Sequence, residues 1–219
     1  SANSGLCTQV CRWEMQLVEK SRPNQQFQIE EDERGSYILN SRDLNLICRI
    51  PELVAAGITS AKIEGRMKSL YYAANTARIY KAAIHHAKAG TPLPQKLVAE
   101  LDSVTHRVYS EGFYNGFDAA EMQDFEKAQY IRTHTYIGAV LQANENFAQI
   151  EVRNKFVSGD KLEIIFPNPK EDQTFTVTDI LNLEREKIVA AQPNMTVLLP
   201  LEAGISAHGL LRRADNLPD

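Results

Sequence analysis

The spacing of apolar residues changes near Tyr136, from a helical period before it to short strand-like runs after it. Residues 69–89 repeat apolar side chains at intervals of three and four, which predicts an amphipathic helix. Beyond Tyr136 the apolar runs are short, and turn signals such as Ser158-Gly159 separate them. The chain therefore combines two kinds of structure, and we expect two domains with separate cores.

The first part alternates predicted strands and helices. A strand at 37–39 precedes a helix that begins near Asp43, and a strand at 60–65 precedes the helix at 69–89. Such repeats favour a parallel sheet with right-handed crossovers, but two repeats are too few to close a barrel. We therefore expect residues 1–92 to form the C-terminal part of a larger, TIM-like α/β barrel.

Two predicted helices, one in this part and one directly after it, are expected to pack by their apolar sides. In the helix at 69–89 the predicted buried stripe includes Leu70, Ala77 and Ile84. A second amphipathic helix at 95–106 would bury Leu101. Both predictions depend on apolar residues alone to mark the buried side.

Residues 93–130 form a predicted helical and aromatic connector, in which RVYSEGFYNGF either packs between domains or covers a site. Residues 131–219 follow it with six runs of strand character, which are TYIGAVLQA, FAQIEV, DKLEIIF, TFTVTDI, TVLLPL and GLLRRA. These runs predict a small antiparallel β-barrel domain, of a kind that often binds RNA or packs beside a catalytic domain. The expected fold class is thus α/β plus all-β.

Composition narrows the classes of function. A net charge of -4 and a pI near 5.8 argue against a generally basic nucleic-acid binder, although a local basic patch can still dock on phosphate. No apolar run approaches the length of a membrane span, and no segment has the pattern of a signal peptide. We expect a soluble, cytoplasmic protein without a membrane partner. The first residue is Ser1 rather than Met, which suggests a fragment or a processed piece.

Two cysteines lie close together near the start of the chain. Cys7 and Cys11 occur in CTQVCRW beside Arg12, whose charge favours the thiolate form. Thiolates bind soft metals and iron–sulfur clusters, and such sites usually need four protein ligands. The remaining cysteine, Cys48, is expected to be a small apolar residue buried in a helix, so the ligand set is incomplete. The alternative is a pair of unligated cytosolic cysteines.

A charged segment, KIEGRMKS at residues 62–69, spans the end of a predicted strand and the start of a predicted helix. Active sites of parallel α/β domains form at that edge of the sheet. Lys62, Glu64 and Arg66 alternate and can share one face. A carboxylate between two cations stays ionised and can orient a substrate, or the cations can bind an anionic one. The alternative is a structural ion-pair cluster.

Four segments together carry a family resemblance. They are CTQVCRW, EDERGSYILNSRDL, AGITSAKIEGRMKSLYYAANTARIYKAAI and VRNKFVSGDKLEII. In order and approximate spacing they resemble the bacterial collagenase-like peptidase family U32, and the nearest branch looks like the tRNA 5-hydroxyuridine modification proteins. The resemblance covers nearly the whole chain but only the C-terminal half of a typical member. The N-terminal half of the barrel, which a complete site needs, is therefore expected to be missing.

The resemblance implies an RNA-modifying enzyme that hydroxylates a tRNA wobble uridine without molecular oxygen. It implies an iron–sulfur cluster in the full-length protein, with prephenate as the oxygen donor and tRNA as the partner. Cys7 and Cys11 match positions that supply two of the four cluster ligands in the hydroxylating branches. Since the other two would lie in the missing segment, we expect this fragment alone to be inactive.

The resemblance also places Lys62, Glu64 and Arg66 at the catalytic mouth of the barrel, where we predict that they act in catalysis. Arg12 and Lys68 are predicted to contact the phosphate or carboxylate groups of a substrate. Two other functions stay open: a peptidase or collagenase-type hydrolase, as the family name says, and a non-catalytic module that binds RNA or a partner chain. The hydrolase has little support, because the sequence contains neither HExxH nor GxSxG.

Overall fold

The computed structural model describes residues 30–32, 35–37, 42–66, 68–116, 130–200 and 207–215. The chain divides into two compact units. Residues 1–45 and 107–130 form the first, and residues 46–106 and 131–219 form the second. The helices and the large sheet both belong to the second unit.

The described part of the first unit contains two small strand pairs. β1 (Glu30–Asp32) pairs with antiparallel β2 (Gly35–Tyr37), and β3 (Asp43–Leu44) pairs with parallel β4 (Tyr109–Ser110). A carboxylate oxygen of Asp43 accepts a hydrogen bond of 3.1 Å from the backbone nitrogen of Arg107. The predicted helix beginning near Asp43 is therefore wrong, because the residue is extended and is held by a segment far along the chain.

The helical segment of the second unit is made of short elements around one long helix. These are the 3-10 helix η3 (Ile47–Arg49), α1 (Ile50–Ala55), α2 (Leu70–Lys88), α3 (Gln95–Ala99) and the 3-10 helix η4 (Glu100–Ser103). Ser69 caps α2, since its hydroxyl accepts a hydrogen bond of 3.1 Å from the backbone nitrogen of Tyr72. The predicted helix at 69–89 is confirmed as α2.

The buried side of α2 differs from the predicted one. Leu70 is 60% exposed, whereas Tyr71, Asn75, Arg78 and Ile79 are buried. Three of these four side chains are polar, because the side of α2 that they occupy faces Glu100 of η4 as well as Asp172 and Arg212. Ala83 of the predicted stripe is buried, but Leu70 and Ala77 are exposed, so the prediction from apolar residues alone was wrong for the first half of the helix.

Two further predictions for the helical segment are wrong. Residues 58–65 form neither helix nor strand and are mostly exposed. A strand needs a neighbour to pair its backbone groups, and none of the described strands pairs with this segment. Cys48 is exposed rather than buried, because the single turn of η3 places Ile47 in the core and leaves Cys48 at the surface.

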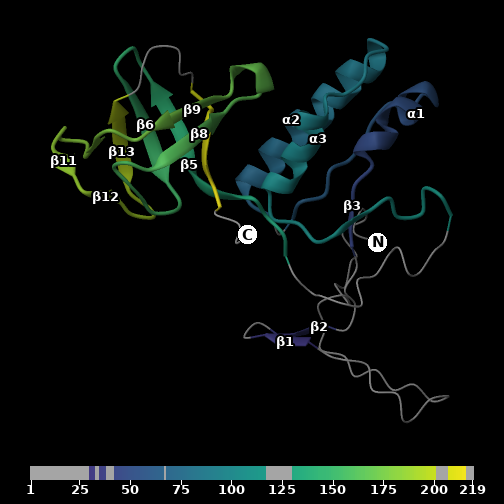
Figure 1. Cartoon of the computed structure of the whole chain (residues 1–219), viewed down its shortest axis with the longest axis horizontal. Coiled ribbons are helices and arrows are strands. Elements are labelled where there is room, and N and C mark those ends of the chain that lie inside the picture. Colours follow the sequence, from purple (N-terminus) through teal and green to yellow (C-terminus); the bar gives the residue numbers. More distant parts are fainter. Residues whose placement is uncertain are drawn as a thin grey trace. The chain divides into compact units, whose positions relative to one another are not determined.

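We call the part of the second unit from residue 131 onward the β-domain. It is built on an antiparallel sheet of eight strands in the order β11-β10-β13-β6-β5-β14-β8-β9 (Figure 1). The strands of this sheet are β5 (His134–Ala143), β6 (Phe147–Val152), β8 (Lys161–Ile165), β9 (Gln173–Thr176), β10 (Ile180–Leu181), β11 (Lys187–Ile188), β13 (Thr196–Pro200) and β14 (Leu210–Ala214). Short β7 (Phe156–Val157) and β12 (Ala190–Ala191) form a separate pair. The predicted antiparallel domain is confirmed as a curled half-barrel. It is open, because β9 and β11 end the order and do not pair with each other.

The core of the β-domain lies on the concave side of this sheet. Burial alternates along β6, as expected for a strand with one buried face. The side chains that are at most 1% exposed include Ile137, Ile150, Leu162, Leu199 and Leu211. Gly138 lies at a crowded place on β5, where an added Cβ would come within 2.3 Å of the Glu151 carbonyl oxygen.

The strand β14 is buried on both sides, which explains its sequence. Leu211 packs in the concave core, whereas Leu210 packs with Tyr71 and Val104 of the helical segment. Arg212 follows on the helical side and is only 4% exposed. The register between β14 and β5 shifts between Leu211 and Arg212, and such bulges redirect side chains.

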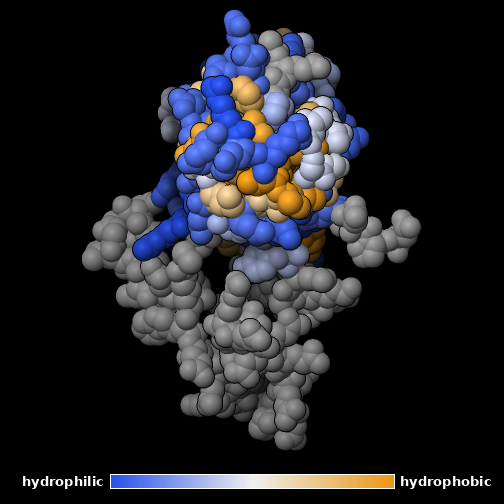
Figure 2. Space-filling model, turned by 90° about the vertical axis from the view of Figure 1, so that its left-hand side faces the viewer, coloured by the Kyte–Doolittle hydropathy of each residue, from blue (hydrophilic) through white to orange (hydrophobic). Residues whose placement is uncertain are grey.

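One face of the β-domain shows apolar residues gathered among hydrophilic ones (Figure 2). The most exposed large apolar side chains near β11 are Val189 at 88% and Leu183 at 55%. Among the described residues, no helix is both long enough and apolar enough to span a bilayer.

Candidate functional site

The predicted catalytic residues lie on an exposed loop between α1 and α2. We call residues 58–66, with Lys68 and Ser69, the α1–α2 loop. Lys62 Nζ is 3.5 Å from Glu64 Oε2, and both side chains are 65% exposed. The backbone nitrogen of Arg66 donates to Glu64 Oε1 at 3.3 Å. The structure therefore brings Lys62 and Glu64 together, in a pair that water screens and that a ligand can reach.

The end of this loop is attached to the first turn of α2. Tyr72 donates a weak hydrogen bond of 3.4 Å from its hydroxyl to the Glu64 carbonyl oxygen. An added Cβ at Gly65 would lie 3.0 Å from this ring, so the ring would have to shift by a few tenths of an ångström to accept it. Lys68 Nζ donates to the Thr105 carbonyl oxygen at 2.9 Å and lies 5.3 Å from the centre of the Tyr72 ring. Lys68, predicted to contact substrate, thus also holds the loop in place.

The predicted metal ligands Cys7 and Cys11, and Arg12 beside them, lie outside the described residues. Within the described ranges, no group of three or more histidine, cysteine, aspartate or glutamate side chains is placed to hold a metal ion. Cys48 is exposed there without a disulfide partner. The described residues therefore do not fit a cluster on their own.

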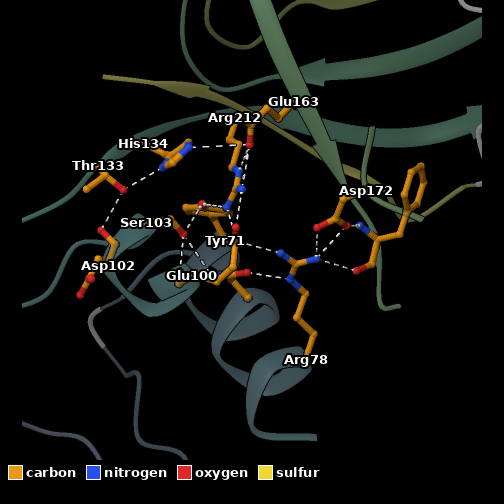
Figure 3. Close-up of polar contacts among 12 residues, drawn as sticks. Tyr71, Arg78, Glu100, Asp102, Ser103, Thr133, His134, Glu163, Asp172 and Arg212 are labelled. Carbon is orange, nitrogen blue, oxygen red and sulfur yellow. Dashed lines mark hydrogen bonds and ion pairs between the residues drawn. The ribbon is translucent and has the colours of Figure 1, made fainter. Parts of the chain in front are cut away.

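The main polar constellation of the structure is one that our sequence analysis missed. Five charged side chains, which we call the buried ion network, join the helical segment to the β-domain (Figure 3): Arg78, Glu100, Glu163, Asp172 and Arg212. Arg78 and Arg212 are 4% and 5% exposed at their side chains, and Glu100 is 13% exposed. Charges so buried are stable only when they are paired and hydrogen-bonded.

Glu100 is shared by both arginines. Its Oε2 lies 2.6 Å from Arg212 Nη1 and 2.9 Å from Arg78 Nη2, and its Oε1 accepts from Arg212 Nη2 at 2.9 Å. Arg78 also donates to both carboxylate oxygens of Asp172 at 2.8 Å, and Arg212 lies 2.7 Å from Glu163. Each arginine thus spans the junction between α2, η4 and the sheet.

Neutral partners complete the network. The Tyr71 hydroxyl accepts from Arg212 Nη1 at 3.1 Å and donates to Ser103 Oγ at 2.8 Å. Asn75 donates to the Glu100 carbonyl oxygen at 2.8 Å and accepts from Arg78 Nε at 2.7 Å. Because these donors and acceptors are matched, the arginines can be buried without unpaired polar groups.

A histidine borders the network at its more open end (Figure 3). His134 Nε2 lies 3.7 Å from Glu163 Oε2, and Nδ1 lies 2.8 Å from Thr133 Oγ1. Thr133 in turn donates to the Asp102 carbonyl oxygen of η4 at 3.2 Å. The start of β5 is thereby connected to η4 and to β8.

The network changes the acidity of its members. Burial by itself would raise the pKa of Glu100, but the hydrogen bonds and charges of Arg212 and Arg78 outweigh it and lower that pKa. The interaction with His134 is the largest influence on Glu163, and with Arg212 it lowers the pKa of Glu163 to about 2. Burial raises the pKa of Tyr71. Both carboxylates are therefore ionised at neutral pH.

Acid is expected to weaken this junction over a defined pH range. The pKa of Glu163 falls from its usual 4.5 to about 2 on folding, so its ionised form stabilises the fold above pH 4.5. This contribution, roughly 2 kcal/mol after allowance for partial exposure, is lost as the pH falls from about 4.5 to about 2. The free energies of unfolding of wild type and Glu163→Gln, measured in urea, should therefore differ most at pH 6 and become nearly equal near pH 2.

The matched control for this titration is Glu145→Gln, because Glu145 is an exposed carboxylate. It should shift the unfolding curve by less than about 0.5 kcal/mol at every pH. If the free energies of unfolding of wild type and Glu163→Gln differed by the same amount from pH 6 to pH 2, the assignment of the lowered pKa to Glu163 would be contradicted.

A shallow groove of about 760 Å³ lies at one end of β8 and β14, and its lining includes Asp160, Arg213 and Asp215. Asp160 pairs with Arg213 at 2.9 Å, and Asp215 pairs with Arg132 at 3.0 Å. The carboxylates of this groove thus have cationic partners, as Glu64 of the α1–α2 loop does.

One pattern in the sequence pointed to the buried ion network. Tyr71, Asn75 and Arg78 are spaced by four and three residues, so they lie along one stripe of α2. Arg212 follows two leucines in a strand-like run. A charged residue that shares a helical stripe with Tyr71 and Asn75, or that follows two leucines in a strand, is a candidate for a buried and paired charge.

The described elements of the second unit thus join a helical segment with an exposed charged loop to an open antiparallel β-domain. The chain belongs to peptidase family U32. The model of "Peptidase family U32" matches residues 1–124, and that of "Peptidase family U32 C-terminal domain" matches residues 132–212. The family resemblance seen in the motifs is thus confirmed.

Curated relatives share both parts of the chain. The tRNA hydroxylation protein P of Escherichia coli is 31% identical over 96% of this chain and 56% of its own length. The protein of the same name from Haemophilus influenzae is 30% identical over 86% of this chain and 50% of its own length. A collagenase of Porphyromonas gingivalis is 24% identical over 98% of this chain and 59% of its own length. The chain spans about half the length of the curated relatives it matches.

Proposed function

We propose that this chain is part of a tRNA hydroxylation protein that converts a wobble uridine to 5-hydroxyuridine. The observation that carries the proposal is the 31% identity to the E. coli tRNA hydroxylation protein P, which extends over 96% of this chain. Similarity of that extent includes the segment with the charged loop and the β-domain alike. In this proposal residues 1–92 complete a larger α/β barrel, and the β-domain packs beside it.

The α1–α2 loop supports a role in binding or orienting an anionic substrate. Lys62 and Arg66 provide exposed positive charges, and Glu64 lies between them in the sequence. Guanidinium and ammonium groups bind phosphate or carboxylate oxygens by charge-assisted hydrogen bonds. We assign Lys62, Glu64 and Arg66 to the catalytic mouth, with Lys68 and Arg12 as further contacts for the RNA backbone or for prephenate.

The cofactor in this proposal is an iron–sulfur cluster, for which Cys7 and Cys11 would supply two thiolate ligands. Among the described residues, no three histidine, cysteine, aspartate or glutamate side chains form a metal-binding group by themselves. The remaining ligands would come from the part of the full-length protein that this chain does not contain. Such a cluster would supply redox chemistry, while this chain contributes charged groups that bind and orient.

The proposal predicts a loss of 5-hydroxyuridine when Arg66 is replaced. We expect full-length protein with Arg66→Ala to restore less than about one tenth of the wild-type level in a strain from which the gene is deleted, because a charge-assisted contact is lost. The level is measured by mass spectrometry of tRNA nucleosides. Lys96→Ala, a change at an exposed lysine of α3, is the matched control and should restore the wild-type level.

Two results would count against the proposed function. One is an unchanged nucleoside profile after deletion of this gene together with related genes. The other is cleavage of gelatin or of a peptide panel by purified protein in chelator-containing buffer, which would favour the collagenase-type alternative. Binding of tRNA without any change in nucleosides would instead favour a non-catalytic RNA-binding module.

A further inference from the structure

Arg212 is a buried cation of the β-domain that contacts three groups at once. Two of them, Glu100 and Tyr71, belong to the helical segment, and the third, Glu163, belongs to the neighbouring strand β8. Burial by itself would lower the pKa of Arg212, but the hydrogen bonds and charge of Glu100 raise it. Arg212 is therefore a permanent cation, and its position on β14 is fixed by pairing with β5 and β8.

The contact with Tyr71 reaches the first turn of α2. Tyr71 is the second residue of that helix, and its hydroxyl accepts a hydrogen bond from Arg212. Its ring stacks on Tyr136 of β5, with ring centres 5.6 Å apart and planes inclined by 3°. The start of α2 is thus held by two adjacent strands of the sheet, through one hydrogen bond and one ring contact.

The α1–α2 loop is attached to the same turn. Ser69 caps the helix by accepting from the backbone nitrogen of Tyr72, the residue after Tyr71. Tyr72 contacts Glu64 and closes over Gly65. Lys68 is fastened to Thr105, which follows η4 closely, and η4 carries Glu100, the main partner of Arg212. Both attachments of the loop therefore lead to elements that Arg212 holds.

We propose that Arg212 is a positioning residue for the α1–α2 loop. It touches neither substrate nor loop, but fixes the first turn of α2 and η4, and through them the orientation of Lys62, Glu64 and Arg66. The role of those three side chains rests on the proposed function above, whereas the control of loop geometry by Arg212 does not. Under the proposed function, the β-domain thus contributes to the geometry of the catalytic mouth.

Two variants of the full-length protein test this proposal. Tyr71→Phe removes the hydroxyl that links Arg212 to α2 and keeps the ring stacked on Tyr136. Arg212→Lys keeps the charge, but a single ammonium cannot replace the fork of donors that spans Glu100, Glu163 and Tyr71. In both variants we expect amide hydrogen exchange of peptides covering residues 62–72 to become about tenfold faster, with exchange in β6 and β13 unchanged.

The matched control is Arg213→Ala. Arg213 is the next residue on β14, and its guanidinium pairs with Asp160 of the β-domain rather than with the helical segment. Exchange in residues 62–72 should stay at the wild-type rate in this variant. Faster exchange that is confined to residues 62–72 and accompanied by a loss of 5-hydroxyuridine, with exchange in β6 and β13 at the wild-type rate, would support positioning.

Unchanged exchange of residues 62–72 in both variants would overturn the proposal. An increase spread evenly over the β-domain would overturn it as well, because that result means general destabilisation. Wild-type protein that forms no 5-hydroxyuridine would refute the proposed function, while the exchange rates would still decide whether Arg212 positions the loop.

Discussion

Replacing Glu100 by alanine is expected to lower the free energy of unfolding of this protein by about 3–5 kcal/mol. The carboxylate is 13% exposed and pairs with Arg78 and Arg212, whose side chains are 4% and 5% exposed. Without it both guanidiniums would keep other partners but lose the one that they share. Removing one member of a buried ionic group costs more than the group contributed, because the opposite charge stays buried.

Urea unfolding followed by circular dichroism measures this loss. The matched control is Glu52→Ala, which breaks the exposed pair of Glu52 with Arg49 at 3.1 Å and should cost less than about 1 kcal/mol. Equal destabilisation by the two substitutions would show that the buried ion network contributes no more than a surface pair.

Gly138→Ala is expected to have an effect of similar size through steric overlap. An added Cβ would lie 2.3 Å from the Glu151 carbonyl oxygen and 3.2 Å from Ile150 Cγ2. Both belong to β6, which pairs with β13 on its other side and so cannot move away freely. We expect a loss of roughly 3 kcal/mol or more, measured as a lower urea midpoint of the β-domain.

Gly209→Ala is the graded comparison for this experiment. An added Cβ there would lie 3.0 Å from Ile164 and Phe166, and both contacts are side-chain atoms rather than backbone. Side chains can shift by a few tenths of an ångström, so we expect roughly 1–2 kcal/mol. A Gly138→Ala protein as stable as wild type would show that β5 and β6 can separate at this point.

The antiparallel part of the fold was predictable because its signals are local. The six strand-like runs after residue 131 correspond to strands of the β-domain, since alternation in β6 and apolar runs bounded by turns determine which residues are buried. The helix α2 was predictable for the same reason, with Ser69 as its cap. Whether the sheet closes into a barrel or stays open was not predictable, because the pairing of the outermost strands depends on residues far apart in the chain.

The segment before the β-domain was predicted less well, because its structure depends on contacts with residues far along the chain. Residues 60–65 were predicted as a strand, but only Ile63 among them favours strands, and no described strand pairs with them. Asp43 has the features of a helix start but pairs with a segment that follows η4. At Asp43 a tertiary contact thus outweighed local propensity.

The polar residues of the candidate site were likewise predicted only in part. Lys62, Glu64 and Arg66 were recognised as a charged group from their spacing, and the structure places them on an exposed loop. The buried ion network was missed because a buried arginine and an exposed one look alike in a sequence. The sequence feature that distinguishes Arg78 from an exposed arginine is its position on the same stripe of α2 as Tyr71 and Asn75.

The separation of Glu100 and Arg212 along the chain has a consequence for biosynthesis. Arg212 leaves the ribosome 112 residues after Glu100. At about 5–20 residues per second, Glu100 on η4 is synthesised roughly 6–22 s before Arg212, its permanent partner. During that interval the nascent chain presents an unfinished surface that chaperones can bind. Slow codons between residues 100 and 212 should therefore lower the yield of soluble protein more than slow codons before residue 70.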